Sequence, residues 1–487
     1  MNKIKSLLLG SAAGLVAIAG AQAADLPVKA KAVEYVKVCS LYGAGFYYIP
    51  GTDTCLKVGG YVRADYRVNA NLGPGFVGQT NAVGAPWAVP QVYNRAFNYY
   101  GTNVRAAVTL DARSQTAYGT LRSYAQFGIN SVGAGGGVAA PLGATPYIQF
   151  AYIQFAGFTF GNTVSFFDIY GITPFHLNHS PTIDGGTGAY GSNVLAYTAQ
   201  FGNGVSASIS LEDPNPRRPG VFGSNGAALV LVNSTKGVNF PDLVANIKIQ
   251  QAWGWAQLSG ALHDASGTWF GPAGAGAFSP LNVATSNNIG WAIAAGGFFK
   301  IPNTAGDTFG IQVSYGHGAT GYVTNGVGYN FIRDSQQTFG IVTDAVFSNA
   351  AIAGTGVAAG ATELTESWAI QVGYEHVWQP GLKSSIAGGY NAVNYNANAT
   401  NIICTAALAA AGCNPDHSWY QIGSKTTWTP VANLDLSVDV MYTRLNGMSY
   451  AAAQVANPAI GGSGTNAGLT GAGIWSGMFR AQRNFWP

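Results

Sequence analysis

The stretch Leu56–Asn69, LKVGGYVRADYRVN, alternates between two kinds of residue with almost no interruption. A period of two places successive side chains on opposite faces of a β-strand. The stretch therefore predicts a strand with one apolar face and one face that carries four charges. The apolar face holds Leu56, Val58, Gly60, Val62, Ala64 and Tyr66, and the polar face holds Lys57, Gly59, Tyr61, Arg63, Asp65 and Arg67.

The same alternation recurs to the end of the chain. Segments 99–113 and 120–130 both show it, and a short turn at 114–118 is expected to join them into a hairpin. Turn sequences such as Gly202-Asn203-Gly204 and Pro380-Gly381 separate later segments. We count roughly fourteen to eighteen such segments, and helical periodicity is almost absent. An all-β fold is predicted. The later segments include 243–250, 309–315, 368–375, 420–428 and 434–442.

The N-terminus reads as an export signal. Lys3 and Lys5 form a basic start, an apolar stretch follows at 7–19, and Ala21-Gln22-Ala23 supplies a small-x-small cleavage site. A transmembrane helix is the alternative, but the apolar stretch is shorter than the ~20 residues that cross a bilayer. Cleavage after residue 23 removes two lysines and lowers the formal net charge from +3 to +1. Such a nearly neutral chain gives no reason to expect a nucleic-acid partner.

The composition favours a membrane barrel over a soluble domain or a helical membrane protein. Only 9% of the residues are charged, while 48% are apolar and 12% are aromatic; soluble domains carry about a quarter charged residues. No apolar run of about 20 residues follows the signal, so spanning helices are not predicted. A barrel strand needs apolar residues only at alternate positions, and its other face can line a wet lumen. We predict a transmembrane antiparallel β-barrel, with residues 24–487 as one domain.

Aromatic residues gather near the predicted strand ends. Rings with a polar edge form girdles at both interfaces of a membrane barrel. The core of a secreted β-sandwich is the alternative explanation, but that fold has no natural place for the arginines that successive strands carry. The aromatic pairs are Tyr99/Tyr100, Phe166/Phe167, Trp253/Trp255, Trp368/Trp378 and Trp419/Trp428.

The four cysteines form two close pairs, Cys39/Cys55 and Cys404/Cys413. In an exported chain each pair is expected to close a local disulfide loop in an oxidising compartment. A metal site is the rival interpretation, but neither pair has Cys-x-x-Cys spacing and only His417 lies nearby. Crossed pairing between the two pairs also remains open.

Three segments resemble a known family. Asp25-Leu26-Pro27, the run VCSLYGAGFYYIPGTDTCLKVGGYVR at 38–63 and the run YIQFAGFTFGNTVSFFD at 152–168 are similar to the outer-membrane porins of rhizobial-type α-proteobacteria. The resemblance implies a sixteen-stranded barrel, a homotrimer embedded among outer-membrane lipid and lipopolysaccharide, and a third external loop folded inward. It also implies passive diffusion of small hydrophilic solutes and ions. We expect no cofactor, no metal site and no catalysis. A substrate-specific channel and a secreted carbohydrate-binding or adhesive β-protein remain the alternatives.

The resemblance also locates a candidate constriction. It places the inward loop at 166–193, where Asp168, Asp184, His176 and His179 stand. Opposed charges across a narrow wet gap create a transverse field that favours polar solutes. The alternative is a loop that lies outside the pore and holds two aspartates by chance. The facing basic wall is expected to consist of Lys57, Arg63, Arg67, Arg105 and Arg122.

Other motifs carry no function. His176 and His179 lack a third ligand beside them, so a metal site is not predicted. Gly316–Gly321 matches G-x-G-x-x-G but opens no helix, which excludes a nucleotide site. Phe485 is expected to be the aromatic residue that closes the last strand, with Trp486 and Pro487 beyond it, because proline cannot donate a ladder hydrogen bond.

Overall fold

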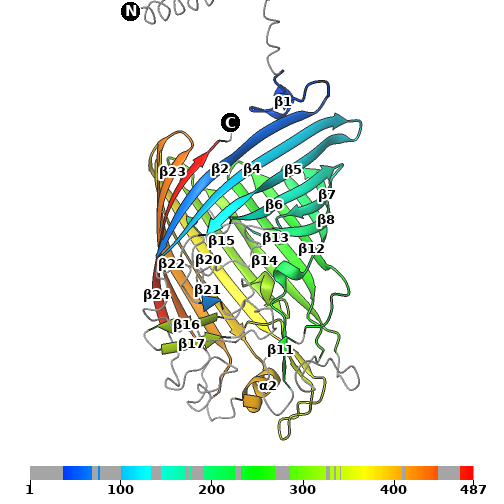
Figure 1. Ribbon diagram of the computed structural model, residues 1–487. Coiled ribbons are helices and arrows are strands. Elements are labelled where there is room, and N and C mark those ends of the chain that lie inside the picture. Colours follow the sequence, from blue (N-terminus) through cyan, green and yellow to red (C-terminus); the bar gives the residue numbers. More distant parts are fainter. Residues whose placement is uncertain are drawn as a thin grey trace, which may run out of the picture.

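The computed structural model describes residues 37–68, 75–76, 100–132, 144–169, 175–177, 191–224, 232–233, 235–268, 286–324, 329–333, 336–340, 342–407, 413–447 and 472–485. Seventeen strands form its largest sheet, and one of them, β1 (Tyr47–Tyr48), only adds a short edge to β2. The other sixteen close into an antiparallel barrel, because β2 pairs with β4 on one side and with β24 on the other (Figure 1). The predicted fold is confirmed.

The barrel strands follow one another round the wall in chain order. They are β2 (Cys55–Val68), β4 (Tyr100–Thr116), β5 (Gly119–Val132), β6 (Ala144–Phe155), β7 (Phe158–Thr163), β8 (Ser192–Gly202), β9 (Val205–Glu212), β12 (Asp242–Gln251), β13 (Gly254–Asp264), β14 (Ile289–Lys300), β15 (Thr308–His317), β20 (Glu366–Gln379), β21 (Leu382–Asn394), β22 (His417–Val431), β23 (Leu434–Asn446) and β24 (Ala472–Asn484).

The two faces of the strands match the sequence pattern. In β4, the side chain of Val104 is 47% exposed on the outer wall, whereas that of its neighbour Asn103 is only 5% exposed. In β2, Val58 and Val62 are exposed outside while Asp65 is buried inside. The outer wall therefore offers an apolar surface to lipid, and the charged face lines the lumen.

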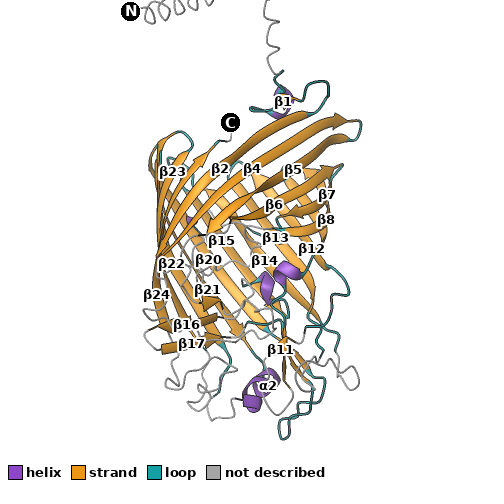
Figure 2. Ribbon diagram, viewed as in Figure 1, coloured by secondary structure: helices purple, strands orange, loops and turns teal. Residues whose placement is uncertain are grey.

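Short turns gather at one end of the barrel and long loops at the other (Figure 2). The β8–β9 turn places both Asn203 and Gly204 at positive φ, 48° and 73°, as expected from the Asn-Gly sequence. The predicted first hairpin is confirmed, but its turn is shorter than expected, because β4 continues through Thr116 and only Ala117 and Tyr118 lie between β4 and β5. In outer-membrane barrels the short turns face the periplasm and the long loops face outward.

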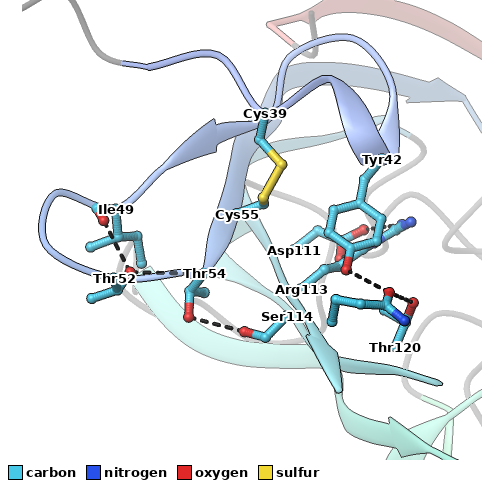
Figure 3. The surroundings of a disulfide bond; sticks show 11 residues. Cys39, Tyr42, Ile49, Thr52, Thr54, Cys55, Asp111, Arg113, Ser114 and Thr120 are labelled. Atoms are coloured by element: carbon cyan, nitrogen blue, oxygen red, sulfur yellow. Dashed lines mark hydrogen bonds and ion pairs between the residues drawn. A yellow bond between two sulfur atoms is a disulfide. The ribbon is translucent and has the colours of Figure 1, made fainter. Parts of the chain in front are cut away.

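A disulfide ties the N-terminal segment to the short-turn end. Cys39 and Cys55 are joined, and Cys404 and Cys413 are joined in the long loop after β21, so the predicted local pairing is confirmed. Figure 3 shows the first bond beside the side-chain hydrogen bond between Thr54 and Ser114 (3.0 Å), which links the start of β2 to β4.

Smaller elements lie at the long-loop end. One four-stranded sheet contains a parallel pair of strands from two different long loops, and a helix of eleven residues packs near it. That helix is the main departure from the expected absence of helices. No helix among the described residues has the length and apolarity to cross a bilayer. These elements are β10 (Val221–Ser224), β11 (Val232–Asn233), β18 (Ala345–Ser348), β19 (Thr362–Leu364), α2 (Ala397–Ala407) and a second sheet of β3 (Gly75–Phe76), β16 (Tyr329–Arg333) and β17 (Gln336–Gly340); 3-10 turns lie at η1 (Ser40–Tyr42), η3 (Asn215–Arg217) and η4 (Thr320–Tyr322).

The aromatic residues divide between the two faces. Trp253, Trp378 and Trp428 are exposed on the outside, as a girdle requires. Trp419 is completely buried on the inner side, and Phe167 is buried inside as well. The interpretation of these two residues as girdle members was wrong, because the alternation of the strand or the path of the loop turns them inward.

The last described residue completes the wall. The Phe485 backbone N–H donates to the carbonyl oxygen of Gly60 at 3.0 Å. Gly60 has φ of 151°, and a Cβ there would collide with the Phe485 ring, so glycine is needed at this closure. Trp486 and Pro487 lie outside the described residues.

Candidate functional site

The third long loop, which joins β7 to β8 at residues 164–191, enters the barrel; we call it the inward loop. Its first residues bind the inner wall. The Phe166 N–H donates to Glu212 Oε1 at 2.9 Å, and its carbonyl oxygen accepts from Asn246 Nδ2 at 2.5 Å and from Gln257 Nε2 at 3.2 Å. These partners belong to β9, β12 and β13, so three successive strands hold the start of the loop.

A buried ion pair holds the next residues of the inward loop in place. Asp168 binds Arg217, which lies in η3 of the following long loop, and the two side chains are 1% and 2% exposed. The Arg217 guanidinium also donates to the carbonyl oxygen of Gly321 at 3.2 Å and lies 4.9 Å from the centre of the Tyr322 ring. Burial lowers the pKa of Arg217 to about 10, which still leaves it protonated at neutral pH. Three external loops therefore meet at one charge pair.

The same junction continues into the wall. The Tyr322 hydroxyl donates to Asp242 Oδ2 at 2.7 Å, and that carboxylate also lies 2.7 Å from His263 Nδ1. The second ring nitrogen of His263 lies 3.3 Å from Asp344. This chain of polar contacts joins the loops to β12 and β13, and its members are buried, so it holds the loops in a fixed position.

The middle of the inward loop reaches the far wall. The Phe175 ring stacks on Phe298 of β14 at 5.8 Å, and its carbonyl oxygen accepts from Ser385 Oγ of β21 at 2.6 Å. The ring covers Gly373 of β20, where any Cβ would collide with it. The Leu177 N–H donates to Asp439 Oδ2 of β23 at 2.5 Å. The described parts of the loop therefore contact the inner wall at strands from β9 to β23.

The predicted loop residues lie as follows. Asp168 is inside the barrel, but its carboxylate pairs with Arg217 and does not stand alone against the opposite wall. The side chain of His176, which follows Phe175 in the chain, is buried. Asp184 and His179 lie outside the described residues. Among the described residues, no group of three or more His, Cys, Asp or Glu side chains is arranged to hold a metal ion.

Arginines cluster on the wall formed by β24, β2 and β4. Arg63 and Arg105 are register partners on neighbouring strands. Asp65 lies among them and binds Arg480 Nε at 2.6 Å, Arg63 Nε at 3.5 Å and Arg67 Nη2 at 3.6 Å. We call Arg63, Arg67, Arg105 and Arg480 the arginine cluster. Three of its four guanidinium groups share one carboxylate, so the cluster keeps an excess of positive charge.

Arg480 was missed by the sequence reasoning. It stands in β24, whose alternation places it on the lumen face, but only the register of β24 on β2 brings it opposite Asp65. A one-residue slip of that register would turn it outward. The only signal available was the alternation of residues 472–484.

The other predicted basic residues lie nearer the short-turn end. Arg122 and Arg113 both bind Asp111, at 2.9 Å and 2.7 Å; we call these two arginines the rim pair. Lys57 donates to the carbonyl oxygen of Ala44 in the N-terminal segment at 3.1 Å. The predicted basic wall thus consists of two groups at different depths.

Aromatic rings and amides hold the arginine planes in place. The Arg105 guanidinium lies 4.5 Å from the centre of the Tyr147 ring, and its Nε donates to Asn130 Oδ1 at 2.7 Å. Arg122 lies over Tyr124 at 4.9 Å. Stacked guanidinium groups lose less freedom when they bind an anion than mobile lysines do. The wall is therefore prearranged to act on a passing ion.

The loop and the arginine cluster face each other. The strand β13, which holds the start of the loop, is the eighth strand from β2 in either direction round the sixteen. The middle of the loop approaches the cluster, because Asp439, which binds Leu177, is the register partner of Met478. The sulfur of Met478 accepts from Arg480 Nη2 at 3.6 Å. The opening between loop and arginines is the candidate functional site.

Comparisons with known proteins show the family of the chain. Residues 25–477 match the family described as the porin subfamily. Porin Omp2b of Brucella neotomae is 31% identical over 352 residues, which cover 68% of this chain and 89% of that protein. Porin Omp2b of Brucella suis biovar 1 is 35% identical over 265 residues, which cover 53% of this chain and 65% of that protein.

One solved structure shows the fold. The outer membrane channel DcaP of Acinetobacter baumannii superposes with a TM-score of 0.55 and covers 90% of this chain and 99% of that one. The sequence identity is 16%, so the likeness concerns the barrel and not the residues of the site.

Proposed function

The chain belongs to the porin subfamily that its residues 25–477 match, and from that premise we propose how its pore acts on solutes. The protein is a general diffusion porin of the outer membrane. In our proposal small hydrophilic solutes and ions pass between the inward loop and the arginine cluster, down their own gradients. No cofactor and no covalent step take part.

The observation that carries this proposal is the imbalance of charge at the opening. Asp168 and Arg217 neutralise each other on the loop side. On the opposite wall, Arg63, Arg67 and Arg480 share the carboxylate of Asp65. Arg105 adds a fourth positive charge as the register partner of Arg63. Among the described residues, the field across the opening therefore comes from the arginine wall, and it attracts anions more than cations.

Replacing Arg63 and Arg105 with glutamine tests the site. The double variant removes two lumen charges, and the reversal potential under a salt gradient should move towards cations. The shift should grow as salt is lowered, because screening reaches only about 8–10 Å at physiological ionic strength. Planar-bilayer recording of the purified protein measures it.

The matched control is Arg444→Gln with Arg483→Gln. It removes the same charge from two exposed arginines whose strand alternation turns them outward. It should leave the reversal potential unchanged. An equal shift in both double variants, or none in either at low salt, would mean that the arginine cluster does not line the narrow part of the pore.

The assembly and processing of the chain are part of the same proposal. The family resemblance supports a homotrimer in contact with outer-membrane lipid and lipopolysaccharide, with residues 1–23 removed and residues 24–487 forming one barrel. On a gel, the unboiled detergent extract should run as a trimer and collapse to a monomer on boiling. A single monomer band under mild detergent, unaffected by heating and by chemical cross-linking, would exclude the trimer.

A further inference from the structure

A recess of about 450 Å³ opens in the inner wall beside the start of the inward loop. Its lining comes from β6, β7, β8, β9, β12 and β13, together with loop residues 164–166 and Asp168. Several lining residues stand close to the short turns, such as Ser206 after the β8–β9 turn and Trp255 after the β12–β13 turn. The recess therefore lies on the periplasmic side of the loop, away from the arginine cluster.

One cation of the recess has no acidic partner. The Lys248 ammonium lies 4.5 Å from the centre of the Trp255 ring, and it makes no ion pair with any carboxylate of the described chain. The acidic residue of the described lining, Asp168, is already bound to Arg217. A lysine held over an aromatic face and left without a counterion is suited to receive an anionic group.

The rest of the lining can both donate and accept hydrogen bonds. Thr198 and Ser208 pair at 2.9 Å, and Gln154 donates to Thr159 at 3.3 Å, which fixes their orientation. Each hydroxyl in such a pair keeps capacity for another partner. The recess therefore offers an ordered array of neutral polar groups, together with the ring faces of Tyr152 and Trp255. Polar arrays beside aromatic faces match a solute that has hydroxyl groups on a short carbon chain.

A second positive region borders the recess. Arg122 of the rim pair donates to Gln154 Oε1 at 3.1 Å and lies 5.6 Å from the centre of the Tyr152 ring. Gln154 and Tyr152 belong to the lining, so positive charge stands on both flanks, from β5 and from β12. This field favours an anion over a neutral solute of the same shape.

We propose that the recess is a binding station for small polyhydroxylated carboxylates, of which gluconate is the simplest probe. The carboxylate pairs with Lys248, and the hydroxyl groups bind the Thr, Ser and amide side chains. The station deepens the proposed channel function and depends on it, because a solute reaches the recess through the pore. It would concentrate such solutes on the periplasmic side of the inward loop.

Gluconate added to a single channel in KCl should interrupt the current in a concentration-dependent manner. Glucose, which lacks the charge, and acetate, which lacks the hydroxyl groups, should both interrupt it less. Lys248→Gln should raise the half-maximal gluconate concentration about tenfold, the loss expected for one charge-assisted hydrogen bond. Lys248→Arg should restore most of the affinity.

The chain offers two matched controls. Lys383→Gln removes a lysine of β21 that pairs with Glu375 at 3.0 Å outside the recess, and it should leave gluconate binding unchanged. Trp255→Ala should weaken binding, whereas Trp253→Ala, at a ring that stacks on Phe299, should not. Two results would overturn the binding station but not the channel. One is a conducting channel whose current gluconate and glucose interrupt equally. The other is an unchanged half-maximal gluconate concentration in Lys248→Gln. A wild-type protein that conducts no KCl would overturn the channel itself.

Discussion

Replacing Arg217 with alanine should destabilise the folded barrel by about 3–5 kcal/mol, because it leaves a buried carboxylate without its partner. Asp168 is 1% exposed and belongs to the inward loop, while Arg217 also binds the carbonyl oxygen of Gly321. Loss of the guanidinium therefore loosens three external loops at once. The temperature at which heating changes the mobility of the protein on a gel should fall. The open-channel current at fixed voltage should become noisier. The anchors at Phe175 and Leu177 remain, so the pore should still form.

A double variant separates charge from packing at this junction. In Asp168→Asn with Arg217→Met, no buried charge is left unpaired, and much of the lost stability should return. The variant keeps most of the volume of both side chains. An unchanged melting temperature and unchanged current noise in Arg217→Ala would show that the pair does not hold the loop. A double variant no better than the single one would show that the guanidinium contacts matter more than the charge.

The wall of the barrel could be predicted from the sequence because the two faces of each strand are encoded in the alternation of its own residues. The alternation at 56–69 states which side chains face lipid, and the structure places Val58, Val62 and Asp65 accordingly. The disulfides could also be predicted, because the two cysteines of each pair lie close together in the chain. The number of strands needed the family resemblance, because alternation does not reveal where two adjoining segments divide.

The site was harder to predict because it depends on contacts between distant segments. Arg480 and Asp65 stand far apart in the chain and meet only through the closure of the barrel. Asp168 was expected to supply a negative charge to the pore, but Arg217 from the next long loop neutralises it. Trp419 was expected in the aromatic girdle because it stands near a predicted strand end, yet its side chain is buried inside the barrel. Such outcomes follow from register and loop path, which composition and periodicity do not encode.

The assignment of faces makes a prediction that depends on neither the loop nor the arginines. Val104 and Asn103 are neighbours in β4, and one lies on the outer wall while the other lies on the lumen side. Val104→Lys places a charge in the lipid and should cost about 2–4 kcal/mol if it lies near the midplane. Denaturant unfolding of the protein refolded into lipid vesicles would measure the cost, and the yield of heat-modifiable barrel would report assembly.

Asn103→Lys is the matched control for this prediction. The new ammonium would enter a wet lumen, where Asp65 is the register partner of position 103 and supplies a nearby negative charge. Folding should be nearly intact, and the reversal potential should move towards anions, since a further cation would join the wall that holds the arginine cluster. Because the period of a strand is two, a shift of one residue would exchange the outcomes of the two variants. If the lysine at 103 abolishes assembly while the lysine at 104 is tolerated, the faces of β4 are reversed. If both are tolerated equally, the outer wall is not exposed to lipid at this position.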